Sequence, residues 1–295
     1  MAPRHLALAV LVTVIWGFNF VVIRHGLDHY PPLLLTALRF ALAALPALVI
    51  PRPAIPLRLL VVIGSVWFLG QFAFLFLSMA NGLPPGLASL LLQSQAFFTI
   101  LIAAAALRER PARRQMAGTG VAFAGLVMIG ASVGGDMTLT GLLLGLMGAL
   151  SWACGNVLVR RAPPADMFPL VVWLSLVPPL PAFALSLAFE GWPAVQSALL
   201  HPTFDGVAAL AYLVFAATFV GFGIWGWLLR LYPAGLVAPF SLLVPITGTL
   251  SAALVLGERF PPLRFGGMAL ILCGLAILAW PKRQAAASAG TGGPG

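Results

Sequence analysis

The sequence predicts an all-α polytopic membrane protein, with ten transmembrane helices in two five-helix inverted repeats around a central cavity. Three observations predict this class: a membrane-like composition, ten apolar stretches of spanning length and an internal duplication. Hydrophobic residues make up 61% of the 295 residues, charged residues only 8%, and the mean hydropathy is +1.04. Soluble domains carry roughly 25% charged residues, so a soluble fold is excluded.

The spanning helices follow from the thickness of the bilayer. A hydrocarbon core about 30 Å thick requires roughly 20 mostly apolar residues in each helix. The predicted spans are 6–24, 33–50, 58–80, 86–107, 114–133, 138–159, 168–189, 207–229, 235–256 and 263–280. These stretches are apolar on nearly every side, whereas barrel strands alternate in polarity, so helices are expected. The first span follows Arg4 as a signal peptide would, but its length and its Trp16 and Asn19 favour a retained helix.

The two halves share one pattern, because residues 86–130 and 235–279 align without a gap at an offset of 149 residues. The matching positions include Gly86 with Gly235, Leu107 with Leu256, Glu109 with Glu258, Gly118 with Gly267 and Gly125 with Gly274. An odd number of spans in each copy turns one copy upside down relative to the other, as in many transporters.

The duplication divides the chain into two units. We expect the first repeat at 1–133, with helices 1–5, and the second, inverted repeat at 138–281, with helices 6–10. A long loop is expected at 190–206. Residues 284–295 are rich in Ala, Gly and Ser and are expected to be a disordered tail or an expression remnant.

In a soluble protein the net charge of +9 would suggest a nucleic-acid partner. In a membrane protein the distribution of positive charge sets the orientation instead, so no nucleic-acid partner is expected. If the N-terminus lies on side A, side B carries only Arg24, Arg259 and Arg264. The basic residues of side A are Arg4, Arg52, Arg58, Arg108, Arg110, Arg113, Arg114, Arg160, Arg161, Arg230, Lys282 and Arg283. Positive residues gather in cytoplasmic loops, so both termini are predicted to be cytoplasmic.

Ionisable groups are expected to be scarce at mid-membrane depth. All seven acidic residues and all four histidines fall in predicted loops or at span ends. Proton relays usually use buried carboxylates or histidines, so we expect no coupling through an intramembrane carboxylate. The alternatives are a misplaced span boundary or coupling through an acid in a loop. Cys154 and Cys273 have no metal or disulfide spacing, and we expect no metal site and no cofactor.

Arg39 is the one charged residue well inside a predicted span, where a charge costs at least about 2.5 kcal/mol. One interpretation is that its guanidinium faces a cavity and attracts a carboxylate. The other is that Arg39, near the end of its helix, reaches the interface or binds backbone carbonyls.

Uncharged polar and aromatic residues complete the candidate site. Trp16 and Asn19 share one helix face, as do Trp152 and Asn156. A buried amide without a partner is costly, so such groups face a wet cavity or join helices to one another. Pro239 and Pro245 flank Ser241 and are expected to bend the helix there. The candidate substrate-binding residues are Trp16, Asn19, Arg39, Gln71, Phe74, Ser78, Gln93, Gln95, Trp152, Asn156 and Ser241.

Several stretches carry a family resemblance, namely 16–23 (WGFNFVVI), 71–76 (QFAFLF), 95–100 (QAFFTI), 151–156 (SWACGN) and 241–245 (SLLVP). With these motifs the chain resembles the EamA family of the drug/metabolite transporter superfamily. The likeness is greatest to its bacterial exporters of cysteine and O-acetylserine, and the superfamily includes aromatic amino acid exporters.

The resemblance implies an exporter of amino acids and related metabolites in the bacterial inner membrane. It would work by alternating access of the two repeats, with broad specificity. Its partners would be small amino acid substrates and the lipid bilayer; the oligomeric state stays open, and a monomer is plausible. A multidrug or lipophilic-cation exporter is the alternative, which the lack of a membrane carboxylate disfavours. No HExxH, GxSxG or paired membrane aspartates appear, so an enzyme is not expected.

Overall fold

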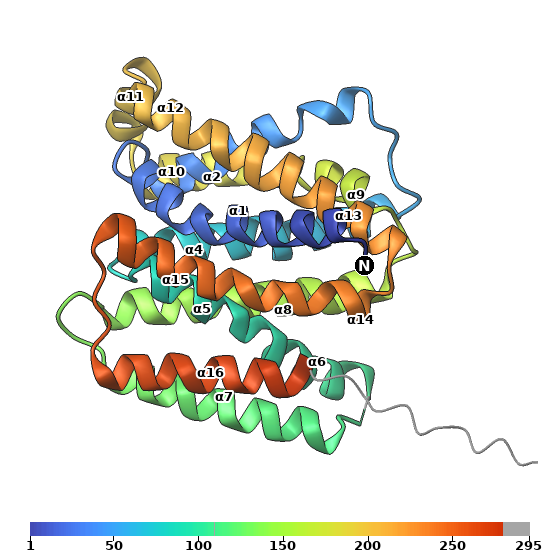
Figure 1. The fold of residues 1–295 in the computed structure, drawn as a ribbon. Helices are drawn as coiled ribbons and strands as arrows, with labels where there is room; N and C mark the ends of the chain where they lie inside the picture. The colour runs from blue at the N-terminus through green and yellow to red at the C-terminus, as the bar shows by residue number, and fades with distance from the viewer. Residues whose placement is uncertain (109, 280–295) are drawn as a thin grey trace, which may run out of the picture.

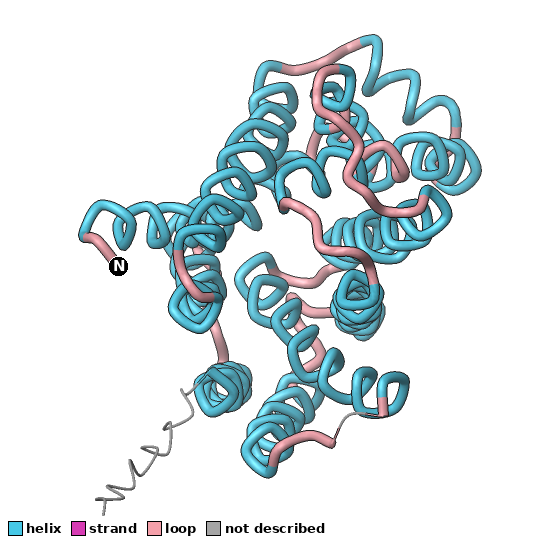
Figure 2. The backbone as a smooth tube through the Cα atoms, turned by 90° about the vertical axis from the view of Figure 1, so that its right-hand side faces the viewer, coloured by secondary structure: helices cyan, strands magenta, loops and turns pink. Residues whose placement is uncertain are grey.

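The computed structural model describes residues 1–108 and 110–279, and this part of the chain is a helical bundle without named β-strands. Long helices run back and forth between two ends of the molecule (Figure 1). We call the end that carries Pro3 side A and the opposite end side B. Figure 2 views the bundle from side A, where helices are seen nearly end-on. The predicted tail at 284–295 and Glu109 lie outside the described residues.

The helices of the two halves follow one another in a regular order. The first half contains α1 (Pro3–Leu27), α2 (Pro32–Ala43), η1 (Leu45–Leu48), α3 (Leu57–Ile63), η2 (Gly64–Gly70), α4 (Gln71–Ala80), α5 (Pro85–Leu91), η3 (Leu92–Ser94), α6 (Gln95–Leu107) and α7 (Arg113–Ala131). The second half contains α8 (Leu139–Arg161), α9 (Met167–Leu174), α10 (Pro179–Phe189), α11 (Trp192–Leu200), α12 (Phe204–Ala211), η4 (Tyr212–Val220), α13 (Gly221–Leu231), α14 (Ala234–Val237), η5 (Ala238–Leu242), α15 (Leu243–Leu256) and α16 (Pro262–Ala279).

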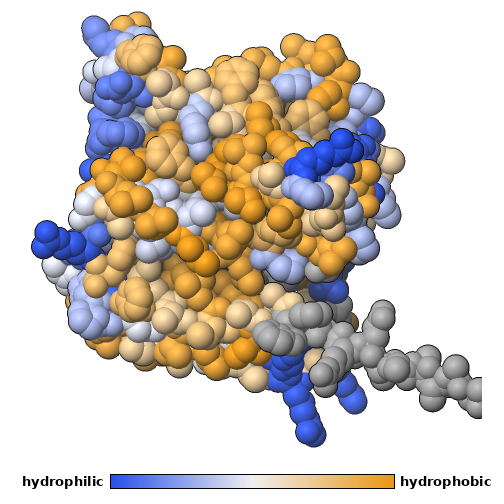
Figure 3. All heavy atoms as spheres, in the orientation of Figure 1, coloured by the Kyte–Doolittle hydropathy of each residue, from blue (hydrophilic) through white to orange (hydrophobic). Residues whose placement is uncertain are grey.

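Eight helical segments of the described chain are long and apolar enough to cross a membrane, so the polytopic class is confirmed. They are Pro3–Leu27, Leu57–Ala80, Pro85–Leu107, Leu139–Arg161, Met167–Phe189, Phe204–Leu231, Ala238–Leu256 and Pro262–Ala279. Two other predicted spans are also helical. Pro32–Leu48 is shorter, and α7 begins with two arginines and a glutamine, which lower its hydropathy. Apolar residues form a band across the middle of the face in Figure 3, and hydrophilic residues gather toward its two ends.

The expected loop at 190–206 is wrong in one respect, because it contains the short helix α11. Gly191 precedes α11 in a left-handed conformation (φ 83°), which lets the chain turn sharply after α10. Pro193 lies in the first turn of α11, where a missing backbone N–H costs nothing.

Irregular turns interrupt the long helices at positions that match between the halves. The π-helical segments η2 and η4 correspond at the offset of 149 residues, since 64–70 fall on 213–219. The tighter 3₁₀ turns η3 and η5 also correspond, because Leu92 falls on Ser241. Pro239 accounts for η5 because proline removes a backbone donor. Of these two turns only η5 contains a proline, so the sequence gives no local cause for η3.

Glycines bring α7 and α16 into close contact. A Cβ atom added to Gly125 would lie 2.5 Å from the Gly267 carbonyl oxygen, and one added to Gly274 would lie 2.6 Å from the Gly118 carbonyl oxygen. The backbones approach each other more closely than any side chain would allow. The two helices therefore form a tight pair along one edge of the bundle (Figure 1).

Candidate functional site

The helical runs Pro85–Leu107 and Ala238–Leu256, which are equivalent in the two halves, touch each other toward side B. The Ser89 hydroxyl lies 3.5 Å from the Pro245 carbonyl oxygen, and the Thr249 hydroxyl donates to the Gly86 carbonyl oxygen at 3.3 Å. A Cβ atom on Gly248 would meet the Ser89 side chain at 2.6 Å. This contact closes the bundle on side B. Beyond η3 and η5, toward side A, the same two runs border a cavity.

This side-A cavity has a volume of about 450 Å³ and includes three of the predicted site residues, Gln93, Gln95 and Ser241. Its lining residues are Gln93, Gln95, Ala96, Ala238, Pro239, Ser241, Leu242, Leu275, Leu278 and Ala279. A small number of polar groups in a mostly apolar wall is typical of sites for small molecules.

Amide side chains fix the polar part of the side-A cavity. Gln93 Nε2 donates a hydrogen bond to the Ser241 backbone oxygen at 3.1 Å, which joins η3 to η5. Asn156 Nδ2 on α8 donates to Gln95 Oε1 at 2.7 Å and to the Thr99 hydroxyl at 3.3 Å. The Gln95 amide is thereby oriented with its nitrogen free of these bonds, and that nitrogen can donate to an oxygen of a ligand.

Arg39 is only 2% exposed. Its side chain does not reach the membrane interface, so that interpretation of its role is wrong. Its guanidinium lies 4.4 Å from the centre of the Phe72 ring, and Nη2 donates to the Thr218 hydroxyl at 3.4 Å. Nε and Nη1 have no hydrogen-bond partner in the structure. A buried guanidinium without a carboxylate is costly, and this cation–π contact offsets only part of the cost.

The remaining candidates lie in the helix core rather than around the side-A cavity. The Trp16 indole N–H donates to the Ala217 carbonyl oxygen at 2.9 Å, and its ring contacts Phe222 and Trp225. Asn19 Oδ1 and Gln71 Oε1 are buried and have no hydrogen-bond partner among the described residues.

Three further candidates do not line the side-A cavity. Ser78 is fully buried and donates to the Leu75 carbonyl oxygen at 2.7 Å. Phe74 and Trp152 are half-buried. The structure therefore brings Gln93, Gln95, Asn156 and Ser241 together and leaves Trp16, Asn19, Arg39, Gln71, Phe74, Ser78 and Trp152 outside this cavity. The role of each of these residues stays a prediction.

Sequence reasoning missed the apolar wall of the side-A cavity and a charged cluster on side B. Leu275 and Leu278 carry no signal, because they resemble any leucine of a spanning helix. On side B the Arg264 guanidinium, only 1% exposed, donates to both carboxylate oxygens of Asp136 at 2.8 and 2.9 Å. These hydrogen bonds, together with the charge of Arg264, outweigh the opposing effect of burial and hold the pKa of Asp136 below its usual value.

Comparison with known proteins places this arrangement in a family. The EamA-like transporter family matches residues 4–131 and 139–280, one match in each half. The chain is 47% identical over 277 residues to a "Probable amino-acid metabolite efflux pump" of Salmonella typhimurium, covering 92% of this chain and 93% of that protein. It is 45% identical over 294 residues to the protein of the same name in Escherichia coli K12, covering 96% and 98%.

More distant likenesses agree with this. An uncharacterised transporter of Bacillus subtilis is 25% identical over 90% of this chain and 93% of its own length. A solved crystal structure with 19% identity matches the fold with a TM-score of 0.62, covering 94% of this chain and 97% of that one. The long apolar helices and these relatives make the chain a multi-pass protein of a bacterial inner membrane, and a transporter rather than an enzyme. The chain belongs to the EamA-like transporter family.

Proposed function

We propose that this protein exports amino acids and related small metabolites from the cytoplasm, with broad specificity. It does so by alternating access: two inverted repeats of five helices, at 1–133 and 138–281, rock about a shared cavity. Side A, with both termini, is cytoplasmic. The names of the two most similar relatives described above support the substrate class, and the excess of arginine on side A supports the orientation.

The matched irregularities support the inverted repeats. Segments η2 and η4, and likewise η3 and η5, recur at the offset that aligns the glycines of the two halves. Equivalent helices with equivalent breaks are expected if each half folds as a copy of the other. With Pro32–Leu48 and α7 counted as spans, each half has five helices and the copies have opposite orientations.

One observation carries the proposal: an amide-lined cavity on side A lies where equivalent helices diverge, and their contact closes the bundle on side B. In the proposed orientation the protein is closed to the outside and loads substrate from the cytoplasm. The amides of Gln93 and Gln95 and the backbone near η5 suit the amino and carboxylate groups that all amino acids share. The leucines of the apolar wall suit a variable side chain, which accounts for broad specificity.

The side-A cavity gives no support to the alternative of a lipophilic-cation exporter. None of the described residues that line the cavity is acidic, so a bound cation would find no counter-charge among them. Arg39 is enclosed in this conformation, and we assign it a role in holding the substrate carboxylate when the helices around Phe72 and Thr218 separate.

Counterflow of labelled amino acids into proteoliposomes tests the proposal. The wild type should exchange several small amino acids, and unlabelled amino acids should compete while a hydrophobic cation should not. Gln95→Ala should weaken apparent substrate affinity by roughly 10-fold, the loss of one or two hydrogen bonds. Gln196→Ala, an exposed glutamine of α11 on side B, is the matched control and should leave exchange unchanged. Competition by the cation alone, or full activity of Gln95→Ala, would contradict the proposal.

A further inference from the structure

A second cavity, of about 560 Å³, lies on side B next to the contact that closes the bundle. Its lining includes three carboxylates, two other titratable side chains and apolar residues from both halves. The residues are Arg24, His25, Asp28, Met79, Ala80, Gly82, Leu83, Pro84, Pro85, Asp136, Leu256 and Glu258. This cavity is therefore a vestibule: if the closing contact opened, the solution on side B would reach the centre of the bundle through it.

Glu258 bridges the two halves at this vestibule. Its carboxylate oxygens Oε2 and Oε1 accept hydrogen bonds from the backbone N–H of Gly86 at 3.1 and 3.3 Å. Gly86 is in the first turn of the helical run Pro85–Leu107, where backbone N–H groups have no partner within the helix. A side chain that follows the end of α15 in the second half thus satisfies a donor at the start of α5 in the first half.

The bridge depends on glycines on both sides. A Cβ atom at Gly86 would lie 2.7 Å from Glu258 Oε2 and 3.1 Å from the Ala252 side chain. Gly257 ends α15 in a left-handed conformation (φ 68°), which other residues rarely adopt, and the chain turns there immediately before Glu258. Gly86 in the first half and Gly257 in the second half therefore permit the close approach of α15 and α5.

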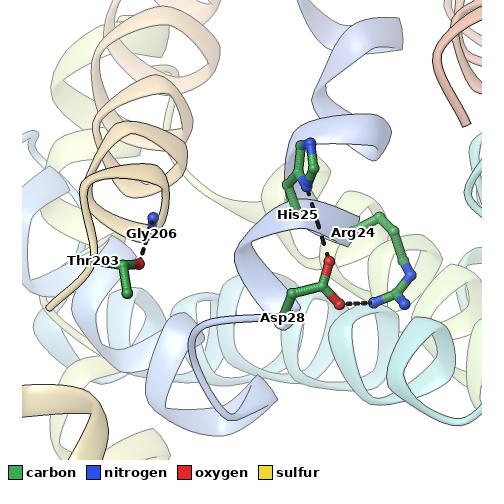
Figure 4. Close-up of polar contacts among 5 residues, drawn as sticks. All are labelled: Arg24, His25, Asp28, Thr203 and Gly206. Carbon is green, nitrogen blue, oxygen red and sulfur yellow. Dashed lines mark hydrogen bonds and ion pairs between the residues drawn. The ribbon is translucent and has the colours of Figure 1, made fainter. Parts of the chain in front are cut away.

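Within the described part of the chain, no basic side chain forms an ion pair with Glu258. Arg264 on α16 gives both terminal nitrogens to Asp136. On α1, Arg24 pairs with Asp28 at 2.7 Å, and His25 lies 3.9 Å from the other oxygen of Asp28 (Figure 4). Burial raises the pKa of Glu258 to about 7, and the charge of Asp136 adds to this, while the Gly86 N–H and Arg264 act in the opposite direction.

We propose that Glu258 is a proton-responsive latch on side B: its carboxylate takes up a proton from the side-B solution as α15 closes on α5, and releases it there as they separate. In the closed vestibule the carboxyl group is partly buried, and this burial favours the neutral form. The opened vestibule returns it to water, which favours the ionised form. The latch rests on the proposed alternating access but requires no particular substrate.

The direction of the pH effect follows from the two states. The closed state binds the proton more tightly, since its Glu258 has a pKa of about 7 against an ordinary value of 4.5 in water. The advantage of the closed state is fully present below pH 4.5 and is lost as the pH rises through about 7. In the proposed orientation, an acidic outer solution therefore returns the transporter to the conformation that loads from the cytoplasm. Because Glu258 takes up and releases its proton on the same side, the latch responds to the pH of the outer solution and carries no proton across the membrane.

A buried reporter on the closing contact can measure the latch. Ser89 is 1% exposed and lies against Gly248, so a cysteine there should react with a membrane-impermeant thiosulfonate only when side B opens. Ser89→Cys would be placed in a Cys154→Ser/Cys273→Ser background, because both native cysteines are free. The full-length protein is labelled in liposomes of known orientation, and each rate is divided by that of the unfolded protein at the same pH. This division removes the ionisation of the thiol itself.

The corrected labelling rate from side B should rise roughly tenfold or more between pH 5.5 and pH 8.5. With Glu258→Gln, a neutral isostere of the protonated form, labelling should stay slow at every pH. Asp28→Asn and His25→Gln, which change titratable groups of the same vestibule, should keep the wild-type profile. Gly86→Ala should label rapidly even at pH 5.5, because its methyl group holds Glu258 away.

Three results would overturn the latch: an unchanged pH profile in Glu258→Gln, a labelling rate that falls as the pH rises, or slow labelling of a folded Gly86→Ala variant. Size-exclusion profiles establish folding for each variant. Because labelling needs no substrate, a failure of amino acid counterflow with an intact pH profile would count against the proposed function and not against the latch. Labelling of the reporter only from the cytoplasmic face would reverse the orientation and leave the latch in place.

Discussion

A single methyl group at Gly248 should force side B open. Gly248 lies where α15 crosses both α5 and α1: an added Cβ atom would sit 2.6 Å from Ser89 and 3.4 Å from the Gly17 carbonyl oxygen. Ordinary contacts begin near 3.4 Å, so Gly248→Ala requires α15 and α5 to separate by about 1 Å. Such overpacking costs about 1–3 kcal/mol. If the closed state alone bears this cost, the ratio of closed to open molecules falls by roughly 5- to 150-fold.

A second substitution tests whether the clash with Ser89 causes the effect of Gly248→Ala. Ser89→Gly removes the side chain that the new methyl group meets, so Gly248→Ala should cost little in the Ser89→Gly background. Thermal unfolding in detergent and counterflow should both recover in the double variant relative to Gly248→Ala alone. Equal damage in the two backgrounds, or no damage in either, would refute the reasoning that this contact closes side B.

The other predictions test the helix pair, the cavity network and the buried cation. Gly125→Ala should lower stability by about 1–3 kcal/mol, because its Cβ atom would lie 2.5 Å from a backbone oxygen of α16. Gly120→Ala is the control on the same helix and should be neutral or stabilising, because nothing lies within 4 Å of its Cβ position. Equal melting temperatures of the two variants would contradict this. Asn156→Leu should reduce exchange by releasing the Gln95 amide, and the double change with Gln95→Leu should add little further loss; fully additive losses would argue against a shared network. Arg39→Met should raise the melting temperature, because an unpaired buried charge is removed, and should lower exchange; a more stable and fully active variant would remove Arg39 from the site.

The helices could be predicted closely because each depends on a local property. Apolar stretches of spanning length must form helices in lipid, whatever they pack against. The predicted span 86–107 therefore coincides with the helical run Pro85–Leu107, and 138–159 with α8, Leu139–Arg161. The connection at 190–206 is different, since it lies outside the apolar spans, and there the short helix α11 was missed.

The site could be predicted only in part. The polar side chains Gln93 and Gln95 and the prolines that flank Ser241 were predicted from the sequence, and the side-A cavity lies among them. Asn19 and Gln71 have the same chemistry and equally suitable helix faces, yet they are buried away from that cavity. A helix face only indicates which neighbours a residue could have, and the neighbours themselves come from distant parts of the chain.

The sequence by itself determined the class of protein, the positions of the helices, the internal duplication and the family, because composition, hydropathy and repeats are properties of the chain. The tertiary structure decided which equivalent helices touch on side B and part on side A, and so where the cavity opens. It also decided that Glu258, which sequence placed only in a loop, meets the Gly86 amide 172 positions away. Such a contact depends on the packing of two separately formed halves, and no local pattern encodes it.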